Sequence, residues 1–425
     1  MLPANLLDSH PNGCATIMPV MDDRLKTLAA AAQFDVCGCG GGMRPRAAID
    51  PTRFIHKAAL PDGGCASLFK ALLTNVCVND CAYCINQKSL DIPRAAFQPE
   101  ELARMFMELY QKRMVQGIFL SSGIAGSAVS TQTRLIETVE ILRRRYKFGG
   151  YVHLKLLPGV GADCVETACR LASRVSVNIE APTARHLARL SSGKNLYEGI
   201  LEPMRQVQSL QLRSPGLVPS GQTTQFVVGA AGECDRDILD ATGALYHDMH
   251  LRRVYFSAYK PIDGSRLSGV GAASPWREHR LYQADWLLRI YRFSHGEVSL
   301  ALDDGGYLNL KHNPKLVIAA RQPWLYPVDI NRASYEELLR VPGIGPTAAR
   351  RITQMRQIHD VTSVEQLQKL RVRWRAAMPF IWFRGMSDGE KQLCMAPLFA
   401  DEFSRLESGS TLGRVVERPS GVGAL

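Results

Sequence analysis

Apolar runs typical of buried strands alternate with amphipathic runs typical of helices between residues 65 and 305. Strands separated by helices indicate βαβ units that form a parallel sheet. Six such units suit a (β/α) barrel or partial barrel, in which the chemistry belongs at the carboxyl ends of the strands. The predicted strands span residues 67–74, 117–122, 151–157, 174–180, 223–230 and 253–259.

The rest of the chain divides around this α/β region. A helix and a glycine-rich loop are expected before the barrel, and a small all-α region is expected after a stretch rich in Gly, Asn and Asp. The final residues lack periodicity, which predicts a mobile tail. The predicted segments are an N-terminal extension (1–45), the barrel (46–305), a linker (306–326), a helical domain (327–384) and the tail (385–425).

The charge of the chain indicates an anionic partner. Its 51 Lys and Arg residues exceed its 40 Asp and Glu residues, which gives a formal net charge of +11. Nucleic acid is the first candidate for such a partner, and a merely soluble basic surface is the alternative. The N-terminus lacks a basic start followed by an apolar block, and no run reaches the roughly 18 apolar residues of a membrane span. We therefore expect a cytoplasmic protein without a membrane partner.

Three cysteines crowd into eight residues directly after the first predicted strand of the barrel. Cys77, Cys81 and Cys84 have the spacing C-x3-C-x2-C. Thiolates favour iron–sulfur clusters or zinc over hard metals, and structural zinc usually uses a fourth ligand from a second C-x2-C pair. The alternative is that these residues are buried thiols that act as small hydrophobic side chains. The pattern favours a cluster with three protein ligands and one open iron.

The pattern C-x3-C-x-aromatic-C, with Tyr83 as the aromatic residue, resembles the signature of radical S-adenosylmethionine (SAM) enzymes. The resemblance implies a [4Fe–4S] cluster held by Cys77, Cys81 and Cys84, with SAM on the fourth iron. It also implies reductive cleavage of SAM to a 5′-deoxyadenosyl radical that removes a hydrogen atom from a substrate. The electron would come from a donor such as flavodoxin or ferredoxin.

The same resemblance implies further contacts to SAM. In place of the family's Gly-Gly-Glu motif the chain has Ser-Ser-Gly at the end of the second strand, without the acid. Lys155 is either a partner of the SAM carboxylate or a solvated lysine at a strand end. Glu233 stands one position late for the family's loosely patterned fifth strand, so no role is assigned to it. The implied cofactor-binding residues are Tyr83, Ser121, Ser122, Gly123, Lys155, Asn178 and Glu180.

Cys37, Cys39 and Cys65 form a looser set of cysteines upstream. They are either ligands of an auxiliary cluster or ordinary thiols, and the spacing does not decide between the two.

A second motif lies near the C-terminus, in residues 329–352. Ser334 and Glu337 form a capping box, "PGIG" (342–345) forms a tight turn, and Pro346 suits the start of the next helix. The motif resembles a helix-hairpin-helix, a module that binds DNA without sequence preference through backbone N–H groups and phosphates. A hairpin used only for packing is the alternative. The expected nucleic-acid contacts are Gly343, Ile344, Gly345, Thr347, Arg350 and Arg351.

The order of the two motifs resembles one family of radical SAM proteins assigned to DNA modification or repair and described alongside a uracil-DNA-glycosylase-like partner. The resemblance extends over roughly residues 25 to 384. It implies radical chemistry on DNA. A tRNA-modifying enzyme, or another enzyme acting on RNA, is the first alternative. A DNA-binding scaffold or redox sensor with a non-catalytic cluster is the second.

Overall fold

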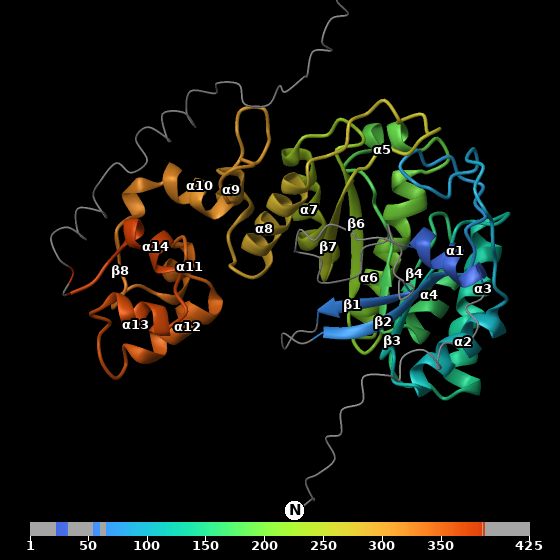
Figure 1. The fold of residues 1–425 in the computed structure, drawn as a ribbon, viewed down its shortest axis with the longest axis horizontal. Coiled ribbons are helices and arrows are strands. Elements are labelled where there is room, and N and C mark those ends of the chain that lie inside the picture. Colours follow the sequence, from blue (N-terminus) through green and yellow to red (C-terminus); the bar gives the residue numbers. More distant parts are fainter. Residues whose placement is uncertain (1–22, 33–53, 60–64, 385, 387–425) are drawn as a thin grey trace, which may run out of the picture.

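The computed structural model of the chain describes residues 23–32, 54–59, 65–384 and 386 (Figure 1). The larger part of them is organised around a curled seven-stranded sheet in which each strand pairs with the next along the chain. The first pair is antiparallel and the other five are parallel. The strands are β1 (Ile55–Ala59), β2 (Cys65–Leu72), β3 (Gly117–Ser121), β4 (Tyr151–Lys155), β5 (Arg174–Ser176), β6 (Gln222–Val228) and β7 (Arg253–Ala258).

Helices connect the parallel strands and lie on the outer side of the sheet (Figure 1). An additional N-terminal helix, α1 (Asp23–Ala31), packs against β2. The connecting helices are α2 (Pro99–Gln111), α3 (Ala128–Glu140) with its π-helical end η2 (Ile141–Arg145), α4 (Ala162–Leu171), α5 (Ala184–Leu190), η3 (Leu196–Leu201), α6 (Glu202–Arg213) and α7 (Asp235–Met249). After β7 comes α8 (Pro275–Arg289).

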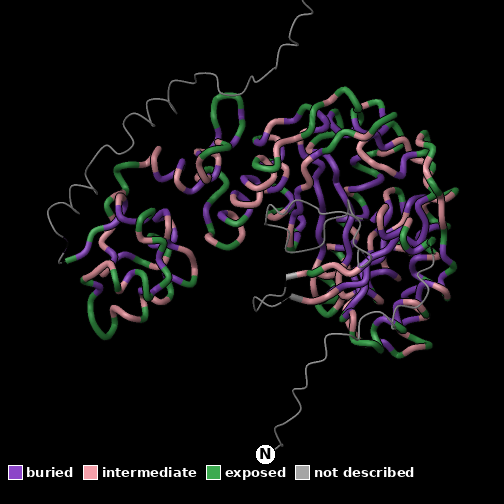
Figure 2. Tube along the Cα trace, viewed as in Figure 1, coloured by how far each residue is buried: buried purple, intermediate pink, exposed green. Residues whose placement is uncertain are grey.

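The predicted partial barrel of six βα units is confirmed by the parallel strands β2–β7. All five residues of β3 and all seven residues of β6 are buried, as expected for parallel strands covered on both faces. Figure 2 shows this buried interior in purple, surrounded by partly and fully exposed residues. Strand β1 was not predicted, because "IHKAA" is a five-residue run without a clear period of two.

A second, smaller hydrophobic core lies in the C-terminal helical domain. Val328–Asp329 (β8) and Ile381–Trp382 (β9) pair in parallel and join the two ends of this domain. The predicted capping box of Ser334 and Glu337 is present on α11, and Ser363 and Gln366 form a second capping box on α13. Its helices are α11 (Tyr335–Arg340), α12 (Pro346–Met355), α13 (Val364–Lys369), α14 (Trp374–Ala377) and the 3-10 turn η5 (Met378–Phe380).

Residues 306–326, predicted as a linker, contain the helix α10 (Pro314–Arg321) and the 3-10 turn η4 (Pro323–Leu325). Helix α10 packs on α8 and on the short helix α9 (His295–Ser299). This group of helices lies between the sheet and α11–α14 (Figure 1). The two hydrophobic cores therefore meet at an ordered group of helices.

Two polar contacts tie the helical domain to this group. Arg340 on α11 forms an ion pair with Glu297 on α9 at 2.7 Å. Lys315 on α10 is buried, donates to the carbonyl oxygen of Ile344 at 2.6 Å and lies 4.7 Å from the centre of the Tyr291 ring. Lys315 thus contacts the "PGIG" turn directly.

Cys37, Cys39, the glycine-rich loop (37–45) and nearly all of the predicted tail (385–425) lie outside the described residues, as does the side chain of Cys65. Within the described parts of the chain, no helix combines the length and the apolar character that crossing a membrane requires.

Burial lowers the pKa of Lys315 to about 7. The unfolded chain therefore binds this proton more tightly than the folded chain, so stability should rise with pH between about 7 and the usual lysine pKa of about 10.4. The free energy of unfolding of the wild type should therefore rise with pH relative to that of Lys315→Met. We expect this change to be at most about 1.4 kcal/mol per pH unit across the range. Urea unfolding at several pH values measures it, and a difference that stays constant with pH would contradict a neutral buried amine.

Candidate functional site

The three cysteines of the C-x3-C-x2-C pattern lie in the loop between β2 and α2, at the carboxyl end of the first parallel strand. Cys81 is buried, and Cys77 and Cys84 are partly buried. No regular helix or strand spans residues 75–95, so the loop needs other groups to bond its peptide carbonyls.

Arg94 supplies four of those bonds. Its guanidinium donates to the carbonyl oxygens of Asn75 (2.7 Å), Asn86 (2.9 Å), Gln87 (2.8 Å) and Leu90 (2.9 Å). The rigid fork of five donors on arginine suits such convergence, which a lysine ammonium cannot reproduce. Arg94 therefore fixes the conformation of the loop that carries the cysteines.

Each of the three sulfur atoms makes one hydrogen bond to its surroundings. The N–H of Ile124 donates to Cys77 Sγ (3.5 Å) and the N–H of Asn86 donates to Cys84 Sγ (3.4 Å). Cys81 Sγ lies 3.5 Å from the hydroxyl of Ser191. Hydrogen bonds to sulfur are among the features that tune the potential of iron–sulfur clusters.

The thiols also interact through their charges. Burial, followed by the proximity of Cys81 and then Cys77, raises the pKa of Cys84 to about 12. The Cys84 thiol is therefore neutral at pH 7 unless a metal displaces its proton, which thiophilic metals do outright. Among the residues that the structure describes, no three His, Cys, Asp or Glu side chains converge on a single metal ion. In a cubane cluster, by contrast, each of three thiolates binds a different iron.

The predicted Ser121-Ser122-Gly123 segment lies against the start of the cysteine loop. The N–H of Gly123 donates to the carbonyl oxygen of Thr74 at 2.7 Å. A Cβ atom at position 123 would lie 2.4 Å from the carbonyl oxygen of Val76, a distance that no side chain tolerates. Glycine is thus required here because the two backbones touch.

Two further segments enclose the loop from other sides. Asp80 accepts hydrogen bonds from the backbone and hydroxyl of Ser192 and from the Ser191 hydroxyl, and it pairs with Arg266 at 3.2 Å. Burial raises the pKa of Asp80, but these hydrogen bonds and Arg266 outweigh it and hold the pKa well below its usual range. The loop is therefore fastened to the segments after α5 and after β7.

A buried lysine that the sequence analysis did not identify connects two of the predicted site residues. Lys194 Nζ donates to the hydroxyl of Tyr83 at 2.7 Å and to Glu180 Oε1 at 3.0 Å. Burial lowers the pKa of Lys194, but the charges of Cys81 and Glu180 outweigh it and raise the pKa above the usual value. Lys194 follows α5 in an ordinary-looking "SSGKN" run, so only the fold reveals its position.

Several buried polar atoms beside the cysteine loop have no partner in the described part of the chain. They include Glu180 Oε2, Asn86 Oδ1 and Gln87 Nε2. Glu180 also holds a left-handed backbone (φ 66°), which is uncommon outside glycine and frequent at functional sites. Buried polar atoms are normally hydrogen-bonded, so these atoms fit a bound polar group such as SAM.

The other two predicted cofactor contacts, Lys155 and Asn178, belong to β4 and to the segment after β5. Lys155 is the last residue of β4 and is paired in register with Ser176. Asn178 is one of the residues that line a small cavity of about 10 Å³ in the interior of the barrel. The cavity is lined by Phe119, His153, Ser176, Asn178, Thr223, Thr224, Gln225 and Tyr255.

Glu233, which received no role from the sequence, is buried and shapes the loop after β6. It accepts hydrogen bonds from the N–H groups of Gly229 and Ala231, and Arg277 pairs with it at 3.6 Å. Glu233 therefore stabilises the backbone of this loop.

The "PGIG" turn joins α11 to α12 as the sequence predicted. Gly343 has φ 87°, and a Cβ atom there would lie 2.6 Å from the carbonyl oxygen of Arg373. Gly345 is the N-cap of α12 and Pro346 is its first residue. Thr347 and Arg350 are exposed, Arg351 is partly exposed, and the side chain of Ile344 is buried in the core of the domain.

Comparisons with protein families agree with this geometry. Residues 72–243 match the radical SAM superfamily, and residues 326–372 match the helix-hairpin-helix motif. The chain is thus a radical SAM enzyme with a C-terminal helix-hairpin-helix. The cofactors of this class are a [4Fe–4S] cluster and SAM. No curated protein matches the chain.

Solved structures with a similar arrangement include HydG, a maturase of the [FeFe]-hydrogenase (10% identity, 52% of this chain and 48% of that chain, TM-score 0.42). HydG from Carboxydothermus hydrogenoformans is another (14%, 51% and 50%, 0.40), and methylornithine synthase (PylB) is a third (15%, 51% and 60%, 0.42). The matches thus span about half to three-fifths of those chains.

The role of Arg94 predicts the effect of Arg94→Lys. The ammonium group of a lysine cannot reach four carbonyl oxygens. Substitution of a residue that orients metal ligands typically lowers metal affinity by about 10–100-fold. We expect reconstituted Arg94→Lys to hold less iron and sulfide per chain than the wild type and to lose them faster to a chelator. The matched control is Arg104→Lys, at an exposed position on α2. Equal cluster retention in all three proteins would disprove the role of Arg94.

The contact between Lys194 and Glu180 also predicts a change in stability. Lys194→Met leaves the buried carboxylate without its cation, so we expect the free energy of unfolding to fall by about 3–5 kcal/mol. Adding Glu180→Gln to this variant should restore part of the loss, because no buried charge then remains uncompensated. Urea unfolding of the wild type, Lys194→Met, Glu180→Gln and the double variant gives the coupling energy between the two side chains. Additive losses would show that the two side chains do not interact.

Proposed function

We propose that the chain uses radical SAM chemistry on DNA, either to modify a nucleotide or to repair a lesion. The observation that carries this proposal is the presence of a helix-hairpin-helix and a radical SAM barrel in one chain, with direct contacts between the hairpin and the helices that follow the barrel.

The hairpin supports the nucleic-acid part of the proposal. Helix α12 begins after Gly345, and its first N–H groups have no carbonyl partner within the helix, so they can bind a phosphate. Thr347 and Arg350 are exposed beside that helix start. The excess of basic residues over acidic residues adds long-range attraction to a polyanion. These contacts would position DNA without reading its sequence.

The cysteine loop supports the catalytic part. Cys77, Cys81 and Cys84 would ligate three irons, and the amino and carboxylate groups of SAM would bind the fourth. When bound, the cluster and SAM supply a 5′-deoxyadenosyl radical that removes a hydrogen atom from the substrate. Tyr83, the backbone of Ser121 to Gly123, Lys155 and Glu180 would orient SAM, and the unpartnered Glu180 Oε2 offers an acceptor for a ribose hydroxyl. Lys194 would hold Tyr83 and Glu180 in place.

The proposal requires further partners and a change in the DNA. A one-electron donor such as flavodoxin or ferredoxin would reduce the cluster, and the resemblance noted above adds a uracil-DNA-glycosylase-like protein as a partner. A base inside a duplex cannot reach a barrel interior, so the target nucleotide would have to leave the helix. The proposed place of action is the cytoplasm.

Anaerobic turnover tests the proposal. The chain is reconstituted with iron and sulfide, supplied with SAM and dithionite, and assayed for 5′-deoxyadenosine with duplex DNA, with tRNA and without nucleic acid. We expect product that increases with duplex DNA and disappears in Cys81→Ala. Product that increases only with tRNA would assign an RNA substrate instead. Product that is unaffected by either nucleic acid would contradict the proposal.

The hairpin predicts a separate effect on binding. Replacing Arg350 and Arg351 together by alanine should weaken binding to duplex DNA of any sequence and reduce the slope of log affinity against log salt by about 2, since each lost phosphate contact removes about one unit. Fluorescence anisotropy across salt concentrations measures it. The matched control replaces the exposed pair Arg113 and Arg144 on the barrel by alanine. This change should leave the salt slope unchanged. An equal effect of both pairs would argue against the hairpin as the DNA site.

A further inference from the structure

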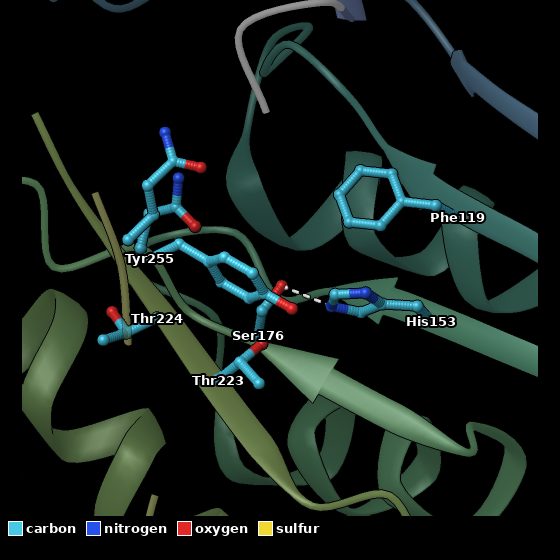
Figure 3. A pocket seen from close by; sticks show the side chains of 8 residues that line it. Phe119, His153, Ser176, Thr223, Thr224 and Tyr255 are labelled. Atoms are coloured by element: carbon cyan, nitrogen blue, oxygen red, sulfur yellow. Dashed lines mark hydrogen bonds between the residues drawn. The ribbon is translucent and has the colours of Figure 1, made fainter. Parts of the chain in front are cut away.

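The interior cavity of the barrel carries polar groups that the fold itself does not use (Figure 3). The hydroxyl of Thr223 is fully buried and has no hydrogen-bond partner within the described ranges. The side chains of Asn178 and Tyr255 are 8% and 4% exposed, and neither makes a hydrogen bond to the described part of the protein. Leaving a fully buried group unpaired is unfavourable, so the Thr223 hydroxyl, together with the polar ends of Asn178 and Tyr255 in the same cavity, indicates a ligand.

The position of these groups fits the substrate. Asn178 lies two residues before Glu180, whose Oε2 atom is also buried without a partner, and Asn178 lines the cavity whereas Glu180 does not. Figure 3 shows the Tyr255 ring directed toward Ser176, which is hydrogen-bonded to His153 at 2.9 Å. The cavity thus lies inside the strands whose carboxyl ends surround the cysteine loop.

The charge of the lining restricts the class of ligand. No acid, lysine or arginine lines the cavity, its one titratable nitrogen base is His153, and the ammonium group of Lys70 lies 5.6 Å from the centre of the Phe119 ring. A phosphate or carboxylate buried there would lack a cationic partner in the wall, which is costly. The amide of Asn178, the hydroxyls of Thr223 and Tyr255 and the aromatic rings of the lining suit an uncharged planar group that both donates and accepts hydrogen bonds.

The size of the cavity restricts the ligand further. About 10 Å³ holds one water-sized group. An exocyclic amino group or a carbonyl oxygen of a heterocyclic ring fits this space, whereas a whole nucleotide does not.

We propose that Asn178, Thr223 and Tyr255 form a pocket that reads the hydrogen-bonding edge of a nucleobase extruded from DNA. The inference rests on the proposed function and deepens it, because it assigns recognition to the base and leaves phosphates to the hairpin. The sequence pattern placed Asn178 among the SAM contacts, and its position in the cavity wall assigns it to the substrate. Enzymes that act on flipped bases commonly read that edge in a closed pocket.

The test uses the full, reconstituted chain and strands that need no flipping. A mixed-sequence single-stranded oligonucleotide is compared with a strand of equal length made of abasic nucleotides, at saturating concentration, by formation of 5′-deoxyadenosine. We expect the strand with bases to stimulate the wild type about 10-fold more than the abasic strand, because a pocket built for hydrogen bonds rejects a ligand that lacks them.

Thr223→Val is the decisive variant, since it keeps the shape of the side chain and removes only the unpaired hydroxyl. We expect it to lose most of the stimulation by bases while its melting temperature stays the same or rises. Its affinity for the oligonucleotide and its iron content should match the wild type, which separates recognition of the base from binding of the backbone or cluster. Tyr255→Phe provides an independent second test of the same kind.

Two outcomes would overturn the inference in distinguishable ways. If the abasic strand stimulates as well as the strand with bases, or if Thr223→Val and Tyr255→Phe retain full stimulation, the pocket does not read bases although action on DNA stands. If neither strand nor duplex DNA stimulates the wild type, the proposed function fails and the inference fails with it.

Discussion

The convergence of four backbone carbonyls on the guanidinium of Arg94 is the interaction on which the site depends. Without it, the segment between β2 and α2 would have to bury peptide groups that no helix or strand satisfies. The fixed loop then brings Cys77, Cys81 and Cys84 within electrostatic reach of one another. It also places Tyr83 against Lys194, which extends the same network to Glu180 in the segment after β5. The conformation of the cysteine loop thus depends first on the Arg94 guanidinium.

The sequence predicted the elements whose signals are local. The six parallel strands appear as apolar runs, and the capping box at Ser334 needs only four residues. The spacing of the three cysteines, with Tyr83 beside the last one, predicted the class of enzyme, because a radical SAM motif lies within a single loop.

The features that the sequence did not predict depend on contacts between distant residues. Lys194 is 111 residues from Tyr83 along the chain, and nothing in "SSGKN" distinguishes it from a surface lysine. Lys315 lies in a segment predicted as a linker, yet it is buried under the hairpin turn. The unused hydroxyl of Thr223 is visible only when strands from across the barrel are assembled. Such residues are identified in the structure by their burial and by the presence or absence of hydrogen-bond partners.

The contacts of Lys315 with Ile344 and of Arg340 with Glu297 hold the hairpin on the helices that follow the barrel. DNA held by the hairpin would therefore stand in a defined relation to the barrel, as the proposed chemistry requires.

The most direct test of the central claim follows the hydrogen atom itself. Duplex DNA synthesised from fully deuterated nucleotides is incubated with the reconstituted chain, SAM and dithionite, and the mass of the 5′-deoxyadenosine produced is measured. Transfer of deuterium from DNA to 5′-deoxyadenosine is the result we predict. Unlabelled 5′-deoxyadenosine, formed at the same rate with and without DNA, would show that DNA is not the substrate.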